Sequence, residues 1–248
     1  MMKSNSWLIL LLFFSASLAG CLENFSESSI SLVVNQEDTD HKIVRVIEEG
    51  QLMEEIYPSV AFDFTGTSSY RDLVEIGIEF GEEKYSVDEP KDGNWIVGVV
   101  FNQYGHYNLT AYALDKEGNR EEFMLNQSIN LEISWSEEDT NEPTDIEFDP
   151  VPAQGKYADY FLVNSTVTNP EFLPNVGNGQ GVDFTWMMIE PGDHTCQSKR
   201  GSVSDGASAD WNTIEFNTLQ PHSLRVQYDE GQDRIDILHI ITVVFSDE

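Results

Sequence analysis

The sequence predicts an all-β fold of two tandem antiparallel β-sandwiches, preceded by a secretory signal and a short acidic tether. Three observations support this prediction. Short runs in which apolar and polar residues alternate recur along the chain, separated by Gly, Asn, Asp or Pro, and helical periodicity is almost absent. An acidic stretch without apolar residues divides the chain. The segments on its two sides share a common spacing of residues.

The first 20 residues have the organisation of a secretory signal peptide. Lys3 is the only charged residue before an almost wholly apolar run at 7–18, and the small residues Ala19 and Gly20 follow it. Such a run is too short for a finished span across about 30 Å of hydrocarbon. No twin arginine precedes it, so we expect general secretion and removal of residues 1–20.

The end of this signal carries a more specific motif. Residues Leu18-Ala19-Gly20-Cys21 resemble the lipobox of prokaryotic lipoproteins. The resemblance implies that Cys21 becomes the lipidated first residue of a protein held outside the cytoplasm at the cell membrane. A diacylglycerol supplies two buried chains at about 0.8 kcal/mol per methylene, enough for a stable anchor. The alternative is an ordinary cleavable signal followed by an incidental cysteine.

Residues 21–40 are rich in Ser, Glu and Asp, and we interpret them as a tether that includes one early strand at 30–34. The first predicted sandwich covers residues 41–135. Its alternating runs lie at 60–64, 76–80, 97–101, 107–113 and 129–135.

Residues 136–143 (SEEDTNEP) are acidic and predict an interdomain linker. The second predicted sandwich covers 144–248. Its alternating runs lie at 161–167, 182–188, 214–216, 224–228 and 237–245, with long loops expected at 174–181 and 193–210. Phe101 and Leu109 match Phe216 and Leu224 at a constant offset of 115, which supports tandem copies of one fold.

Residues 107–119 (YNLTAYALDKEGN) are similar to the penultimate strand and following turn of the immunoglobulin-like domains of bacterial and archaeal surface proteins, a group that includes PKD and cadherin-like modules. Trp186 resembles their buried core tryptophan. The PKD signature WDFGDG is absent, so the resemblance is general. It implies two immunoglobulin-like sandwiches of a class that mostly binds, spaces and adheres.

The charge is extreme: 44 acidic residues against 13 basic ones give a net charge of −31 and a sequence pI near 4.1. No basic patch is available to release counterions, which excludes nucleic acids and anionic lipid faces as partners bound through Lys or Arg. The acidity favours a saline, archaeal setting, because carboxylates hold hydration in salt and the net charge opposes aggregation.

Clusters of acidic residues suggest a calcium-binding site. Glu138, Asp139 and Asp145 lie at the predicted domain junction, where hard oxygen ligands make cadherin-like modules rigid. The alternative is a solvated acidic surface, because 44 acids bring carboxylates together by chance. No EF-hand loop is present, and no other cofactor is expected.

Soft metal ligands are sparse, and the five histidines are scattered singly. Met187, Met188, His194 and Cys196 form a set that could suit copper, but their order does not match a blue-copper loop. With Cys21 lipidated, Cys196 has no intramolecular disulfide partner. We expect a small buried or half-exposed residue; the alternative is a thiol that forms an intermolecular bridge or a reactive site.

No motif for nucleophilic, metalloprotease or phosphate-binding chemistry is present, so the sequence does not predict an enzyme. Glycosylation sequons stand at Asn24, Asn108, Asn126 and Asn164.

We expect a non-enzymatic surface spacer, adhesion or recognition module. Its partners would be the membrane, through lipid on Cys21, and other surface proteins or glycans. The alternative is a substrate-binding lipoprotein that presents a sugar or peptide to envelope machinery. An apolar pocket lined by Trp or Tyr near the loops at 174–181 and 193–210 would favour that alternative, and flat, charged surfaces would favour a spacer.

Overall fold

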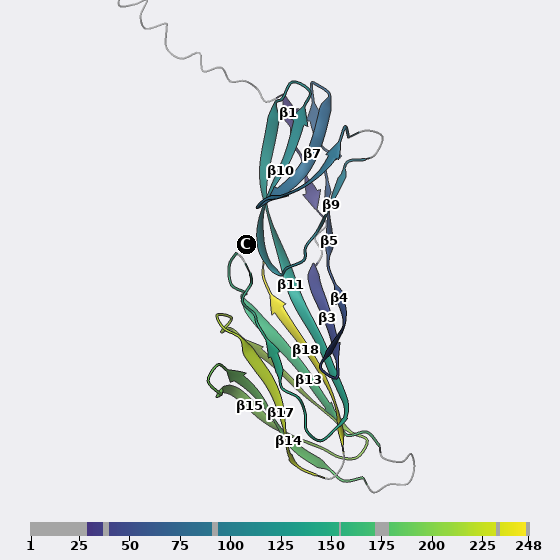
Figure 1. The fold of residues 1–248 in the computed structure, drawn as a ribbon, viewed down its shortest axis with the longest axis vertical. Helices are drawn as coiled ribbons and strands as arrows, with labels where there is room; N and C mark the ends of the chain where they lie inside the picture. Colours follow the sequence, from purple (N-terminus) through teal and green to yellow (C-terminus); the bar gives the residue numbers. More distant parts are fainter. Residues whose placement is uncertain are drawn as a thin grey trace, which may run out of the picture.

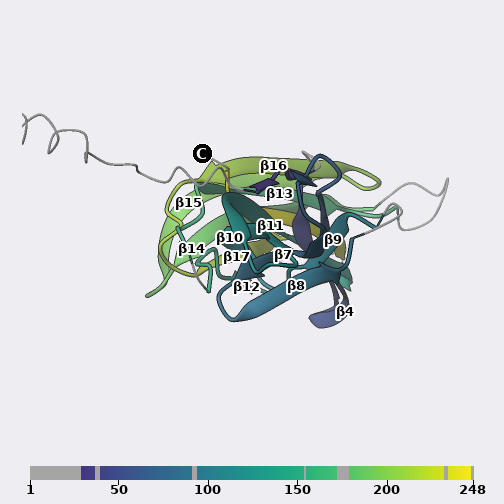
Figure 2. The same ribbon diagram turned by 90° about the horizontal axis from the view of Figure 1, so that it is seen from above.

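The computed structural model describes residues 29–36, 40–90, 94–153, 155–171, 179–231 and 234–246. Within these ranges the chain forms eighteen β-strands and no helix, so the prediction of an all-β fold is confirmed. Among the described residues there is accordingly no helical segment of the length and hydrophobicity that a membrane span needs. The strands pack into two regions, one above the other along the long axis (Figures 1 and 2).

The region nearer the start of the chain, here named the N-terminal sandwich, packs a sheet of order β2-β5-β9 against β8, β7, β10 and the first half of β11. Phe80 of β7 stacks on Phe101, which follows β9, at 5.5 Å between the sheets. The early strand expected at 30–34 is reduced to the two residues of β1, which pairs β6, and the equally short β2 follows it. The bounds are β1 (Ile30–Ser31), β2 (Asn35–Gln36), β5 (Ser59–Asp63), β6 (Ser68–Ser69), β7 (Leu73–Phe80), β8 (Glu83–Asp88), β9 (Ile96–Val100), β10 (Gly105–Asp115) and β11 (Arg120–Thr140).

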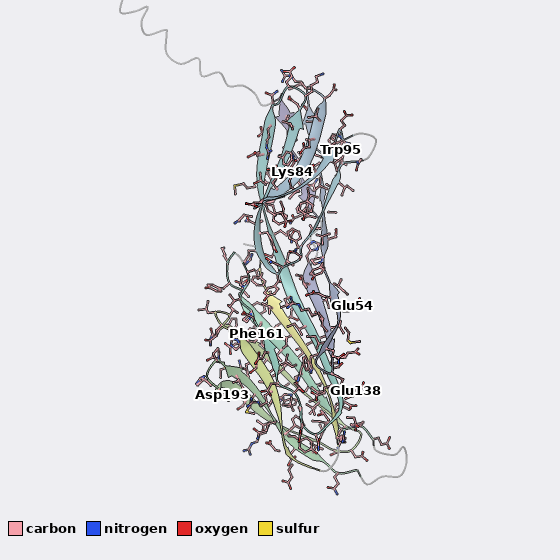
Figure 3. The ribbon with its side chains drawn as sticks, in the orientation of Figure 1. Glu54, Lys84, Trp95, Glu138, Phe161 and Asp193 are labelled. Atoms are coloured by element: carbon pink, nitrogen blue, oxygen red, sulfur yellow. The ribbon has the colours of Figure 1, made fainter. Side chains whose placement is uncertain are left out.

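The other region, the C-terminal sandwich, packs a sheet of order β12-β17-β14-β15 against β16, β13, β18, the second half of β11, β3 and β4. Trp186 of β14 is fully buried between the sheets, and its Nε1 donates to Ser165 Oγ of β13 at 2.6 Å. Phe161 of β13, labelled in Figure 3, packs edge-on against Phe148 of β12 at 5.0 Å. The bounds are β3 (Lys42–Glu48), β4 (Gln51–Ile56), β12 (Ile146–Phe148), β13 (Tyr160–Thr168), β14 (Val182–Glu190), β15 (His194–Val203), β16 (Ser208–Glu215), β17 (His222–Glu230) and β18 (Ile235–Val244).

Three strand pairings recur in the two sandwiches. In the first, β5 pairs β9, β7 pairs β8, and β7 pairs β10. In the second, β13 pairs β16, β14 pairs β15, and β14 pairs β17. These three pairings recur in the same order, but β10 also pairs β11 whereas β17 pairs β12, so the tandem copies expected from the sequence stay a prediction. Phe101 and Phe216, matched in sequence, each follow the strand that crosses to the opposite sheet, but Phe101 is buried and Phe216 is 67% exposed.

One strand belongs to both sandwiches. Residues 120–129 of β11 pair with β10. Beyond them, residues 131–137 and 140 pair with β18 on one edge, and residues 130–136 pair with β3, in parallel, on the other. Figure 1 shows β11 running from the upper region into the lower one. The buried apolar residues of the two regions form one continuous cluster.

The linker expected at 136–143 therefore needs correction. Residues 136–140 are the end of β11, and Glu137 is buried in phase with Ile133 and Trp135. Its carboxylate accepts the backbone N–H of Thr144 at 2.9 Å. The hydrogen bonds between strands join backbone groups, so acidic side chains do not prevent a strand from forming. The one carboxylate that points inward only needs a hydrogen-bond donor, which Thr144 supplies. The expected boundary at 135/136 lies inside this strand, and β3 and β4, assigned to the first sandwich by sequence, join the second.

Side chains close the seam between the sandwiches. Phe245, which follows β18, is 2% exposed and lies edge-on to the ring of His106 at 5.4 Å and 6.1 Å from that of Tyr104. Its backbone N–H donates to Asn130 Oδ1 at 2.7 Å. The Tyr104 hydroxyl donates to the carbonyl of Asp149 at 2.8 Å. The C-terminal sandwich is thus attached to the N-terminal one by β11 and by these contacts.

Candidate functional site

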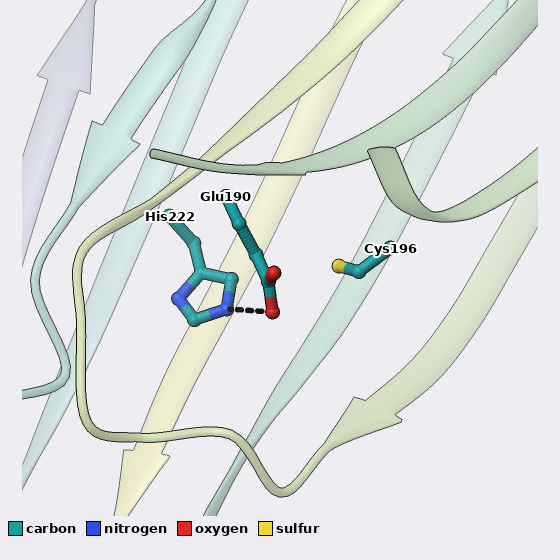
Figure 4. Close-up of side chains that lie close together, drawn as sticks. All are labelled: Glu190, Cys196 and His222. Atoms are coloured by element: carbon teal, nitrogen blue, oxygen red, sulfur yellow. Dashed lines mark ion pairs between the residues drawn. The ribbon is translucent and has the colours of Figure 1, made fainter. Parts of the chain in front are cut away.

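Glu190, Cys196 and His222 come together on the flank of the C-terminal sandwich (Figure 4). Glu190 ends β14, Cys196 lies in β15, and His222 begins β17. Their ligand atoms all lie within 4.8 Å of one another, and no other such group of His, Cys, Asp or Glu occurs in the described part of the chain. The turn that joins β14 to β15 is marked by Asp193 in Figure 3.

Backbone pairing explains this meeting. Ile189 pairs with Ser223, which sets the neighbouring Glu190 beside His222. On the other edge of β14, Met188 pairs with Gln197 and Ile189 with Thr195, so Cys196 is an extra residue without a partner. Such a bulge re-aims the side chain of the extra residue. Here it leaves Cys196 half-buried beside the other two side chains.

The ring of His222 has a fixed orientation. Its Nδ1 donates to the carbonyl of Gln220 at 2.9 Å, and its faces pack on Phe148 and Phe161. The side chain is fully buried, and Nε2 has no hydrogen-bond partner. Burial lowers the pKa of His222 despite the nearby carboxylates, which favours the neutral ring. Nε2 therefore presents a lone pair towards Glu190 Oε1, 3.9 Å away.

Glu190 is held from two directions. Asn217 Nδ2 donates to its Oε1 at 2.7 Å, and His194 Nδ1 donates to its Oε2 at 3.3 Å. The hydrogen bond from Asn217 is the main reason that the pKa of Glu190 is lowered, so the carboxylate is ionised at neutral pH. Asn217 is positioned in turn by Glu215, whose Oε1 accepts the Asn217 backbone N–H at 2.9 Å.

The sulfur of Cys196 is not activated as a nucleophile. Burial raises the pKa of this thiol, and the charges of Glu215 and Glu190 raise it further. Its Sγ lies 3.5 Å from the Met188 carbonyl, to which the thiol donates. Thiol catalysis needs a thiolate stabilised by a cation, and here the thiol is neutral beside a neutral imidazole. Sulfur, imidazole nitrogen and carboxylate oxygen together are instead donors for a metal ion.

The sequence pointed to part of this group only. Cys196 and His194 belonged to the soft-ligand set, but His194 is mostly exposed and contacts Glu190 rather than the sulfur. Cys196 meets the backbone carbonyl of Met188. Glu190 and His222 were missed because 32 residues separate them and no spacing motif joins them. The bulge at Cys196 carries no sequence signal of its own.

Glu138, Asp139 and Asp145, the residues considered as calcium ligands, each have a different partner in the structure. Asp145 binds Arg225 through both oxygens, at 2.5 to 2.9 Å, and Asp139 lies 3.3 Å from Arg234. Glu138 donates its backbone N–H to Glu49 instead. Calcium binding stays a prediction, and it requires displacement of two arginines.

The remaining sequence-based sites divide into two groups. Cys21 and Asn24 lie outside the described residues. Asn108, Asn126 and Asn164 are exposed on their strands, as glycosylation requires, and Asn108 and Asn126 stand directly opposite each other in the β10·β11 pair. Glycosylation stays a prediction, and crowding between these two positions favours one glycan over two.

A hollow on the C-terminal sandwich has a volume of about 780 Å³ and lies on the outer face of β14, β15 and β17. Its lining includes Asp183, Arg200 and Asp229 but no Trp or Tyr, so it does not meet the criterion set for the substrate-binding alternative. The loop expected at 193–210 is mostly β15 and the start of β16, joined by a short turn at 204–207.

The sequence matches no protein-family model and no curated protein. Among solved structures the chain is similar to carbohydrate-binding modules of the β-sandwich superfamily, at 8% identity over 85% of this chain and 96% of that chain, with a TM-score of 0.29. The fibronectin(III)-like modules of Clostridium thermocellum CbhA give 12% identity, 78% and 91% coverage, and a TM-score of 0.27. For Bacteroides uniformis β-glucuronidase the identity is 11%, the TM-score is 0.29, and the match spans 87% of this chain but only 30% of the enzyme. Scores this low assign neither ligand nor activity, and the fold class stands on the strands of the chain itself.

Proposed function

We propose that this protein is a non-enzymatic lipoprotein, anchored outside the cytoplasm by lipid on Cys21, that serves as a stiff spacer and recognition module at the cell surface. One observation carries the proposal: β11 continues through both sandwiches. At about 3.3 Å per residue, its 21 residues extend over about 70 Å. Domains joined by a flexible linker change their relative orientation, whereas a strand shared by two sandwiches fixes the orientation of one to the other.

The seam supports a spacer in a second way. Phe245 and Tyr104 bring apolar surface and hydrogen bonds to the point where the sandwiches meet. Bending at this point would expose that surface and break those hydrogen bonds. The described chain starts at the outer end of the N-terminal sandwich, where Figure 1 shows β1, so the C-terminal sandwich would be the part held farther from the membrane.

The charge suits display on a crowded surface. A net charge of −31 repels neighbouring copies and the anionic lipid face, which keeps the module extended and separate. Recognition would then be directed at surface proteins or glycans, in agreement with the absence of a basic patch.

The test uses intact cells that express the full chain. A membrane-impermeant amine reagent should label the wild-type protein without lysis, and the labelled protein should stay with the membrane fraction. Mass analysis should find a mature form that starts at Cys21 and carries lipid. Cys21→Ser should release the protein to the medium or leave it unprocessed, while the matched Cys196→Ser variant stays anchored. Labelling only after lysis, or a native N-terminus elsewhere without lipid, would contradict the proposal.

A further inference from the structure

We propose that Glu190, Cys196 and His222 form a zinc site that joins β14, β15 and β17 on the flank of the C-terminal sandwich. The site goes beyond the proposed spacer function and does not depend on it. It rests on the convergence of three different donor atoms from three strands and on the buried, unpartnered Nε2 of His222, which faces the other two ligands.

The unpartnered nitrogen is the strongest sign of a ligand. A buried polar atom without a hydrogen bond costs free energy, and native structures seldom leave one without a reason. His222 Nδ1 already donates to a backbone carbonyl, so Nε2 is the free lone pair. This is the arrangement of zinc-binding histidines, whose second nitrogen is hydrogen-bonded to fix tautomer and ring orientation.

The donor set and its charge favour zinc. One thiolate, one imidazole and one carboxylate are ligand types that Zn²⁺ accepts, and three protein ligands leave the fourth position open to water. Zn²⁺ binding breaks the S–H bond of Cys196, a sulfur–zinc bond forms, and the proton leaves to solvent. The thiolate and Glu190 then balance the two positive charges, so the half-buried site becomes neutral overall.

The distances fit an empty site that closes by a small movement. Zinc–ligand bonds of about 2.0–2.3 Å in a tetrahedron place ligand atoms about 3.3–3.6 Å apart. Glu190 Oε1 and His222 Nε2 are 3.9 Å apart, and the widest separation in the group is 4.8 Å or less. Rotation of the Cys196 and Glu190 side chains is enough to close this difference, because neither is fully buried.

The surroundings supply support and access. Asn217, held by Glu215, orients the Glu190 carboxylate, as outer ligand partners do in metal sites. A surface pocket of about 290 Å³ is lined by both Glu190 and His222, which opens the site to solvent. His194 lies outside this group of three, but its Nδ1 contacts Glu190 Oε2 at 3.3 Å and so also helps to hold the carboxylate.

The first experiment titrates the purified full-length chain with Co²⁺ and then displaces it with Zn²⁺. Wild-type protein should bind one Co²⁺ with a thiolate-to-metal absorption band and tetrahedral ligand-field bands, both lost on adding Zn²⁺. Cys196→Ser, His222→Gln and Glu190→Gln should each weaken binding at least about tenfold, and Cys196→Ser should remove the charge-transfer band. The matched controls Cys21→Ser, His41→Gln and Glu138→Gln should bind within about twofold of wild type.

A second measurement uses unmodified protein, so it does not depend on whether the variants fold. At a hundredfold excess over Kd, Zn²⁺ should raise the melting temperature by roughly 5–10 °C and protect Cys196 from alkylation. Equal affinity of wild type and the Cys196 or His222 variant would overturn the site. So would a wild-type Co²⁺ spectrum without a thiolate band, or alkylation of Cys196 at the same rate with and without Zn²⁺.

Discussion

Replacement of Phe245 by alanine should destabilise the two sandwiches together. Phe245 is 2% exposed at the seam, between the rings of Tyr104 and His106. A buried phenylalanine removes about 150–200 Å² from water, worth about 4–5 kcal/mol at 25 cal/mol per Å². Core Phe→Ala changes cost about 3–5 kcal/mol, and the same range is expected here. The backbone hydrogen bond to Asn130 survives the change, so the loss reports packing alone.

The assay is urea unfolding followed by pulse-labelling hydrogen exchange and mass spectrometry, which reads peptides from both sandwiches. In wild type and Phe245→Ala alike, peptides of β7 and of β14 should unfold at one shared urea midpoint, lower in the variant. The melting temperature should fall by roughly 6–20 °C. Phe216→Ala, the same substitution at a 67% exposed position, should stay within about 0.5 kcal/mol of wild type. Loss of stability in the C-terminal sandwich alone, or equal effects of the two substitutions, would refute the reasoning.

Three further predictions follow from single features. Gly77→Ala should lower the free energy of unfolding in urea by about 1–3 kcal/mol, because the new Cβ would meet the Tyr112 hydroxyl at 2.5 Å. The control Gly98→Ala, whose Cβ would have its nearest atom at 3.9 Å, should be near neutral, and equal losses for the two variants would contradict the prediction. Burial lowers the pKa of His239 to about 3 from its ordinary value near 6.5. As the pH drops from about 6.5 towards 3, the unfolded chain therefore binds a proton that the folded chain does not, and the free energy of unfolding should fall. His239→Gln should flatten that part of the curve of urea midpoint against pH, and an unchanged slope would count against the prediction. Mild proteolysis followed by mass spectrometry should not cut first at 136–143, because Ser136, Glu137 and Thr140 pair with β18 and the Glu137 side chain is buried; an early cut there with two stable fragments would restore the linker.

The alternation of side chains was a reliable guide to single strands. Val97, Val99 and Phe101 alternate with exposed neighbours as predicted, and Trp186 is buried as the core residue expected there. Period-two patterning reports which face of a strand is buried, and this depends on neighbouring residues only. Strands with clear alternation were therefore predictable from local sequence, whereas β15 lies where a loop was expected.

Partners of strands were harder to predict. The parallel pairing of β3 with β11 joins residues about 88 positions apart in the sequence. The alternation of apolar and polar residues within a strand does not specify which other strand will pair with it or along which edge. The linker prediction failed because acidity was taken to mean solvent exposure, whereas Glu137 is satisfied by a backbone donor. Composition describes side chains, and the sheet is built from backbone groups.

The site at Glu190 and His222 was missed for a related reason. The two residues meet through the register of β14 on β17, and Cys196 joins them through a bulge. Single histidines and cysteines in a sequence carry no information on such long-range register. Only the soft character of Cys196 was visible, without the ligands that complete the set.

The claim that β11 unites the sandwiches into one stiff unit is tested most directly by a distance across the seam. Spin labels at Met124→Cys on β11 and Leu238→Cys on β18, in a Cys196→Ser background, sit at exposed strand positions. Leu238 pairs with Ser136, which is 12 residues beyond Met124 on β11, so double electron–electron resonance should give a separation of about 40 Å. A single narrow distribution there, unchanged by added salt, is the predicted result. A broad or multi-peaked distribution would show that the two sandwiches move independently and would contradict the account.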